Sequence, residues 1–174
     1  MDPSFRWGDG ESMTDLGKAK ALALLVPAAL LAGAYGSQIW GGLFPCEMCW
    51  YQRYAHFAAL AFALLAYALR SWPDRGRSLV WLAALAILTS AGIGFYHAGV
   101  ELKFFPGYTQ CTSHIHATST ADLMQQIMDA PLIRCEDIQW KFLGISMAGW
   151  NFIVSSVSGL LILWLSLRRP RRRT

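Results

Sequence analysis

The sequence predicts an all-α membrane protein, in which four transmembrane helices form a bundle and a short amphipathic helix lies in the second external loop. Only 15% of the 174 residues are charged and 55% are hydrophobic, whereas a soluble domain carries about a quarter charged residues. The apolar residues are also clustered in four blocks, each near the ~20 residues that cross a bilayer as a helix. These blocks cover residues 19–39, 51–69, 79–100 and 146–167.

The first block, at residues 19–39, is predicted to be a permanent anchor. Lys18 and Lys20 precede most of it, and Ala32-Gly33-Ala34 is similar to the cleavage site of a secretory signal. Three further blocks follow, and they favour an anchor that is not cleaved. The chain therefore has three predicted parts: a polar cytoplasmic tail at 1–17, one membrane domain at 18–168 and a basic cytoplasmic tail at 169–174.

The basic residues predict which side of the membrane each loop faces. Eleven of the fifteen Lys and Arg residues lie before the first block, between the second and third, or after the fourth: Arg6, Lys18, Lys20, Arg70, Arg75, Arg77, Arg168, Arg169, Arg171, Arg172 and Arg173. Because cytoplasmic loops carry an excess of Lys and Arg, both termini are predicted to be cytoplasmic. The loops at 40–50 and 101–145 then lie outside. Since the charges flank membrane spans, the net charge of +4 does not indicate nucleic-acid binding.

A pair of cysteines, Cys46 and Cys49, lies where the second block begins. Arg53 follows Cys49 by four residues, so on a helix it lies on the same face, one turn deeper. A thiol pair with a cation at the bilayer surface indicates thiol chemistry coupled to a compound dissolved in the lipid. Arg53 could instead be a snorkelling interface residue, although an ionisable residue so placed is a functional candidate by default.

The segment at 101–145 is the longest between two blocks. Within it, residues 118–129 begin with cap-like Thr and Ser residues and place Leu123, Ile127 and Met128 near one helical face. This pattern predicts a short amphipathic helix on the outer membrane surface. The alternative is an ordered external loop with scattered apolar residues.

All four cysteines fall in segments assigned to the outside, where an even count indicates disulfides. Two structural bridges are one interpretation. A Cys46–Cys49 bridge would restrain the unfolded chain little, because it closes so short a loop, and such pairs are typically redox-active. A Cys111–Cys135 bridge could contribute roughly 3 kcal/mol as a structural staple, or it could be exchangeable.

Metal and haem sites compete with this interpretation. Structural zinc is disfavoured, because a second closely spaced cysteine pair is missing and the compartment is oxidising. A c-type haem would need His directly after Cys49, where Trp50 stands. Paired histidines for a b-type haem are scarce, since only His56 and His97 lie in or near the apolar blocks. No metal is predicted.

The chain resembles the DsbB family over about residues 18–167. The features that carry the resemblance are four spans, Cys46 and Cys49 followed by Tyr51 and Arg53, a later external loop with Cys111 and Cys135, and Gln139-Trp140-Lys141-Phe142-Leu143-Gly144 before the fourth span. The resemblance implies an inner-membrane protein-disulfide oxidoreductase of bacteria that depends on quinone. Such an enzyme reoxidises a periplasmic DsbA-like thiol oxidase and passes the electrons to ubiquinone or menaquinone.

The resemblance also implies a role for each site residue. Cys111 and Cys135 match the pair that receives electrons from the DsbA-like partner, and Cys46 and Cys49 match the pair next to the quinone. Arg53 matches the cation near the quinone ring. His97 and Met147 fall where further quinone contacts are expected.

Two other functions remain open on the sequence. Enzymes of the vitamin K epoxide reductase family also combine four helices with a Cys-x-x-Cys, but their active pair comes late in the bundle, whereas this one precedes the second span. A non-enzymatic membrane scaffold with structural disulfides is the other. Oxidation of a dithiol partner on addition of quinone would distinguish the enzyme from the scaffold.

Overall fold

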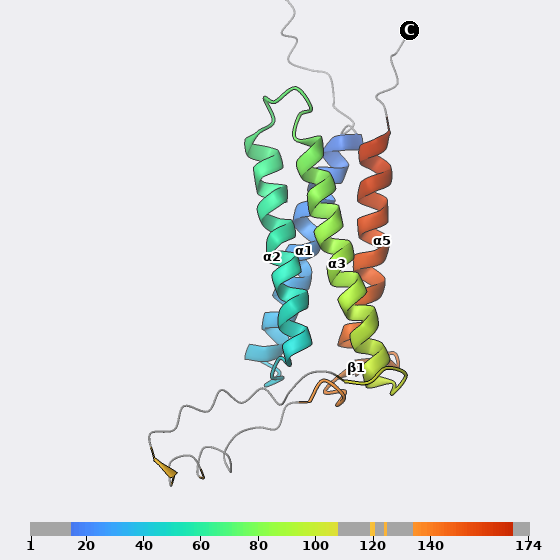
Figure 1. Cartoon of the computed structure of the whole chain (residues 1–174). Helices are drawn as coiled ribbons and strands as arrows, with labels where there is room; N and C mark the ends of the chain where they lie inside the picture. Colours follow the sequence, from blue (N-terminus) through green and yellow to red (C-terminus); the bar gives the residue numbers. More distant parts are fainter. Residues whose placement is uncertain (1–14, 108–118, 121–123, 125–133, 169–174) are drawn as a thin grey trace, which may run out of the picture.

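The protein is a bundle of antiparallel helices, described here from a computed structural model over residues 15–107, 119–120, 124 and 134–168. In this part of the chain four long helices run alternately up and down: α1 (Asp15–Ile39), α2 (Glu47–Ala68), α3 (Arg77–Glu101) and α5 (Met147–Leu167) (Figure 1). A minimal antiparallel hairpin, β1 (Lys141–Phe142) and β2 (Ile145–Ser146), precedes α5. The predicted helical class is confirmed.

Three of these helices, α1, α3 and α5, are long and apolar enough to cross a membrane, as judged by length and composition. The fourth, α2, is not apolar enough, because Gln52, Arg53 and His56 lie in its first half. The structure therefore supports a membrane protein with three candidate spans. That α2 also crosses the bilayer, which would give four spans, stays a prediction.

Local chemistry sets where α2 and α5 begin. Cys46 is the N-cap of α2, and its sulfur accepts a hydrogen bond of 3.4 Å from the Cys49 backbone N–H. Ser146 caps α5 in the same way, its hydroxyl accepting from the Gly149 N–H at 3.1 Å. Each cap pairs one of the backbone donors that a helix start leaves open. As a result α2 starts before the predicted residue 51, and Cys49 lies in its first turn.

The turn between α2 and α3 is built around Asp74. Its carboxylate accepts hydrogen bonds from the Gly76 N–H at 2.9 Å, the Ser78 N–H at 3.0 Å and the Ser78 hydroxyl at 2.6 Å. Gly76 has a φ of 76°, and a Cβ there would lie 2.6 Å from the carbonyl oxygen of Ala66. Only glycine meets both demands.

Small residues let the helices approach closely. Seven alanines are fully buried between the helices: Ala19, Ala23, Ala59, Ala63, Ala66, Ala83 and Ala84. Between α3 and α5, a Cβ added at Gly94 would lie 3.1 Å from the carbonyl oxygen of Ala148. Such small-residue contacts are how helices pack in lipid, where the hydrophobic effect does not drive them together.

The predicted amphipathic helix at 118–129 lies outside the described residues except for Ser119, Thr120 and Met124. The predicted tails at 1–17 and 169–174 lie outside them almost entirely, and the limits of the membrane domain stay predictions.

Candidate functional site

The two cysteines of the first loop form a close thiol pair at the start of α2. Cys46 is buried, and its sulfur lies 3.0 Å from the sulfur of Cys49, which is half-buried. This distance is a hydrogen-bonding contact and not a disulfide bond, whose length is about 2.05 Å. Both residues are therefore described as thiols.

Cys135 of the second loop reaches the same place. It is 4% exposed, and its sulfur lies within 4.8 Å of both the Cys46 sulfur and a ring nitrogen of His97. Hydrogen bonding of the Cys46 thiol to Cys135 and then to Cys49, together with burial, raises the pKa of Cys46. The structure thus brings together one cysteine from each of the two cysteine-bearing loops, 89 positions apart in the chain. The other predicted cysteine, Cys111, lies outside the described residues.

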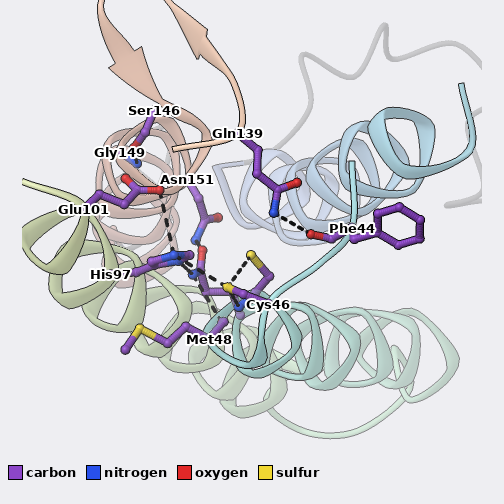
Figure 2. A network of polar contacts seen from close by, with 11 residues as sticks. Phe44, Cys46, Met48, His97, Glu101, Gln139, Ser146, Gly149 and Asn151 are labelled. Carbon is purple, nitrogen blue, oxygen red and sulfur yellow. Dashed lines mark hydrogen bonds and ion pairs between the residues drawn. The ribbon is translucent and has the colours of Figure 1, made fainter. Parts of the chain in front are cut away.

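His97, in the last turns of α3, contacts this cluster directly. Its Nε2 lies 3.6 Å from the Cys46 sulfur and 3.8 Å from Oε1 of Glu101 (Figure 2). The imidazole also forms a hydrogen bond with the backbone of Cys135. Among the described residues, Cys46, His97 and Cys135 are the group that could offer ligands to a metal ion. Thiolates and imidazole suit zinc, but the same closeness of two sulfurs is what thiol–disulfide exchange requires. The predicted absence of a metal stays a prediction.

A chain of polar side chains continues from His97 into the bundle. The contacts are Gln52 Nε2 to His97 Nδ1 at 3.0 Å, Asn151 Nδ2 to Gln52 Oε1 at 2.7 Å, His56 Nε2 to Asn151 Oδ1 at 2.9 Å and Ser90 Oγ to His56 Nε2 at 3.0 Å. They join α2, α3 and α5 inside an otherwise apolar region. Buried polar groups of this kind need partners, and here most of them provide partners for one another. Nδ1 of His56 has none among the described residues.

Arg53 is held at the junction of α1 and α2. Its side chain is buried, and the guanidinium donates to Gln38 Oε1 at 2.8 Å and to the Ala34 carbonyl at 3.0 Å. The guanidinium also lies over two aromatic rings, 4.6 Å from the centroid of Tyr35 and 5.0 Å from that of Trp50. The positive charge of Arg53 therefore has polar partners on α1 and aromatic partners on α1 and α2.

A cavity of about 530 Å³ opens between α1, α2 and α5. Five of the seven predicted site residues line it: Cys46, Cys49, Arg53, His97 and Met147. Residues of α1, such as Leu30 and Leu31, give it an apolar wall. An apolar cavity with a few convergent polar groups is typical of a site for a small organic ligand. The residues present therefore fit a small, largely apolar organic ligand that also carries polar groups, and a quinone is one such compound.

Sequence reasoning missed part of the site. His56 is a candidate from the sequence only as a haem ligand. Four further residues of the site are not predicted from the sequence: Gln52, Ser90, Asn151 and Glu101. A signal was available for Gln52 and Asn151, because polar side chains inside an apolar block are costly and mark functional positions. The contact of Cys135 with Cys46 carried no such signal.

Comparison with known proteins gives consistent matches. The model of the family described as Disulfide bond formation protein DsbB matches residues 18–165. A Disulfide bond formation protein B from Paracidovorax citrulli (strain AAC00-1) is 33% identical over 172 residues, which cover 90% of this chain and 91% of the relative. One from Acidovorax sp. (strain JS42) is 30% identical over 173 residues, covering 90% and 92%. The matched region includes both cysteine-bearing loops.

Proposed function

Because the chain belongs to the DsbB family of disulfide bond formation proteins, we propose that it is a thiol–quinone oxidoreductase of the bacterial inner membrane. It reoxidises a periplasmic DsbA-like dithiol oxidase and passes two electrons to a membrane quinone. The observation that carries this proposal is the contact of Cys135 with Cys46, at the edge of an apolar cavity lined by Cys49 and Arg53.

The relay consists of thiol–disulfide exchanges, and each one breaks one S–S bond as it forms another. A thiolate of the partner attacks Cys111 of a Cys111–Cys135 disulfide, and Cys135 leaves as a thiolate. Cys135 then attacks Cys46 of a Cys46–Cys49 disulfide, and Cys49 leaves as a thiolate. The second thiolate of the partner attacks the partner–Cys111 disulfide, which releases the oxidised partner and leaves Cys111 as a thiolate. The two electrons of the partner dithiol are then carried by the thiolates of Cys111 and Cys49, and the Cys135–Cys46 approach supports the second of these exchanges.

The quinone supplies the acceptor for these two electrons when it is bound. The proposed residues that hold it are Arg53, His97 and Met147, beside Cys49. DsbA is a strong oxidant, with a potential of about −120 mV, so its acceptor must be driven by a compound that is still more oxidising. Arg53 contributes a fixed positive charge near Cys49, which favours the thiolate form of that sulfur.

This function requires both cysteine-bearing loops to face the periplasm. The cluster of Cys46 and Cys135 lies at one end of the bundle, and the α2–α3 turn with Arg70, Arg75 and Arg77 lies at the other (Figure 1). The positive-inside rule then favours cytoplasmic termini and a periplasmic site.

The test is oxidation of a dithiol partner by the purified protein. A reduced DsbA-like protein is mixed with the chain in nanodiscs, and ubiquinone or menaquinone is added. We expect one partner disulfide to form for each quinone reduced, with no oxidation when either the chain or the quinone is omitted. Failure of both quinones to support oxidation would contradict the proposal and favour the scaffold.

A further inference from the structure

The imidazole of His97 has defined neighbours on both of its nitrogens. Nδ1 lies 3.0 Å from Nε2 of Gln52, and Nε2 faces the Cys46 sulfur at 3.6 Å and Glu101 Oε1 at 3.8 Å. The imidazole also forms a hydrogen bond with the backbone of Cys135. A neutral imidazole carries one proton, on one nitrogen or the other. The position of that proton decides whether Nε2 donates a hydrogen bond to the Cys46 sulfur or accepts one from it.

The orientation of the Gln52 amide determines which nitrogen of His97 carries the proton. Its nitrogen lies 3.3 Å from the carbonyl oxygen of Met48, a group that can only accept. Its oxygen accepts from Nδ2 of Asn151 at 2.7 Å. The same nitrogen therefore faces Nδ1 of His97. Because an amide NH₂ can only donate, Nδ1 must accept and carries no proton.

The orientation of Asn151 is anchored in the same way. Its Nδ2 lies 3.3 Å from the carbonyl oxygen of Ser90, and its Oδ1 accepts from the Ser155 hydroxyl at 3.1 Å. Two backbone carbonyls, of Met48 and of Ser90, thus set the direction of the whole chain of hydrogen bonds. Reversing Gln52 would place its oxygen against the Met48 carbonyl and leave two acceptors facing each other.

We propose that Gln52 is a positioning residue that holds neutral His97 with its proton on Nε2, so that this N–H donates to the Cys46 sulfur when that sulfur leaves as a thiolate. This inference rests on the proposed relay, in which a Cys46–Cys135 disulfide must be resolved. The thiolate of Cys111 attacks Cys135, the Cys111–Cys135 bond forms, and the Cys46–Cys135 bond breaks. The bonding electron pair goes to Cys46, and no proton is transferred.

With its proton on Nε2, His97 can donate a hydrogen bond to the Cys46 sulfur but cannot act as a base toward it. A hydrogen bond to a charged acceptor is stronger than one to a neutral acceptor, so the Nε2–H stabilises Cys46 as a leaving group. The same N–H prevents Nε2 from acting as the base that deprotonates a Cys46 thiol. Within the described residues, the titratable groups that face His97 are Cys46, Cys135 and Glu101, while Gln52 and Asn151 from α2 and α5 are neutral.

The first test is spectroscopic and needs neither partner nor quinone. The full chain is labelled with ¹⁵N-histidine and studied by NMR at about pH 8, where the unperturbed imidazole is neutral. The His97 signals are assigned by their loss in His97→Gln. We expect a protonated Nε2 and an unprotonated Nδ1. A proton on Nδ1 in the unaltered chain would overturn the proposal.

The second measurement uses Gln52→Glu, because a carboxylate can only accept and draws the proton to Nδ1. In this variant the ¹⁵N pattern should reverse, with a protonated Nδ1 and an unprotonated Nε2. An unchanged pattern in the folded variant would show that Gln52 does not position the ring. If Gln52→Glu fails to fold, the tautomer of the unaltered chain still decides the first half of the proposal.

The consequence for Cys46 is measured in a chain whose three other cysteines are alanine. Absorbance at 240 nm reports the pH at which the Cys46 thiolate forms. Gln52→Glu should raise this pH by about one unit or more, the effect of losing a hydrogen bond to a charged group. Gln52→Leu, which adds no charge, should raise it by less.

Gln139→Glu is the matched control. Gln139 lines the same cavity and donates to the Phe44 carbonyl, so this substitution adds the same charge without contacting His97. It should leave the pH of Cys46 thiolate formation nearly unchanged. An equal shift in Gln52→Glu and Gln139→Glu, or no shift in Gln52→Leu, would overturn the proposal. A chain that keeps the expected tautomer but fails to oxidise a partner would contradict the proposed function alone.

Discussion

Arg53 is a buried charge with neutral partners, so its contribution to quinone binding can be tested by removing the charge. Its hydrogen bonds run to Gln38 and Ala34 of α1. Arg53→Gln keeps hydrogen-bonding capacity but removes the charge, so quinone affinity should fall about tenfold or more, the loss typical of a hydrogen bond to a charged group. Arg53→Lys should restore affinity in part, because it keeps the charge but loses the planar fork. Fluorescence quenching on quinone titration measures the affinity.

Arg70→Gln is a suitable control, because Arg70 lies at the other end of α2, away from the cavity. It should bind quinone as the unaltered chain does. Unchanged affinity in Arg53→Gln would make Arg53 an interface anchor with no part in the site.

The order of the relay makes a prediction for Cys135. With Cys135→Ser, Cys111 no longer has a disulfide that a partner thiolate could attack, so the experiment uses the oxidised partner. The Cys111 thiolate attacks the partner disulfide, one partner sulfur leaves as a thiolate, and no Cys135 thiolate is present to resolve the new bond. A mixed disulfide between the partner and Cys111 should accumulate, visible on a non-reducing gel and assigned by peptide mass. The complex should not form when Cys111→Ser is combined with it. A complex joined through Cys46 would refute the order.

At the scale of elements, the contact between α3 and α5 depends on Gly94. A Cβ there would lie 3.1 Å from the Ala148 carbonyl, whereas Gly92 on the same helix has open space around it. Gly94→Ala should destabilise the bundle by about 1–3 kcal/mol, as overpacking does. Gly92→Ala should be neutral or stabilising, by up to about 1 kcal/mol of helix propensity. Thermal unfolding of both variants in one detergent measures the difference, and equal midpoints would contradict it.

The turn between α2 and α3 should lose stability at low pH. Hydrogen bonds, first from the Ser78 hydroxyl and then from the backbone, lower the pKa of Asp74 to about 2. Because this folded-state pKa lies below the unfolded value of about 3.9, the stability it contributes is present above pH 4 and is lost as the pH falls toward 2. Asp74→Asn and Ser78→Ala should both weaken this dependence. Melting temperatures between pH 5 and pH 2.5 test it, and identical slopes for all three chains would refute it.

At the scale of the whole molecule, the orientation in the membrane is the prediction on which the function depends. Reporter fusions after Arg75 and after Thr174 should read cytoplasmic, and a fusion near Ser119 should read periplasmic, since most basic residues flank the first two positions. A cytoplasmic reading near Ser119 would place the cysteines in a reducing compartment. The topology and the redox function would then fail together.

The helical class could be predicted because long apolar blocks report it directly, as the helices α1, α3 and α5 show. The hairpin of β1 and β2 could not, because its central residues Leu143 and Gly144, with φ of 52° and 80°, lack the Asn-Gly or Asp-Gly signal of such turns. Two-residue strands also leave no alternating pattern to recognise.

For the site, the chemistry of single residues is enough to name the cysteines and Arg53 as candidates, since thiols and a cation at the bilayer surface have few other uses. His97 and Met147 are predicted only through the family resemblance. The amides of Gln52 and Asn151 each stand out as a polar group inside an apolar block, but their contact joins residues 99 positions apart in the sequence. No local pattern encodes such a contact, and the approach of Cys135 to Cys46 depends on how two loops fold back over the bundle.

The polarity of α2 has a consequence for biosynthesis. As the chain emerges, α1 is made before α2, and within the described part of the chain both hydrogen-bond partners of the Arg53 guanidinium belong to α1. The partners of Gln52 and His56 are made later: His97 and Ser90 belong to α3, and Asn151 belongs to α5, the last of the four long helices to be made. Exposing Gln52 and His56 to lipid in the interval is costly. If α2 crosses the bilayer as predicted, α1 and α2 gain from entering the membrane as a pair, and the polar contacts of Gln52 and His56 are complete only when α5 is in place.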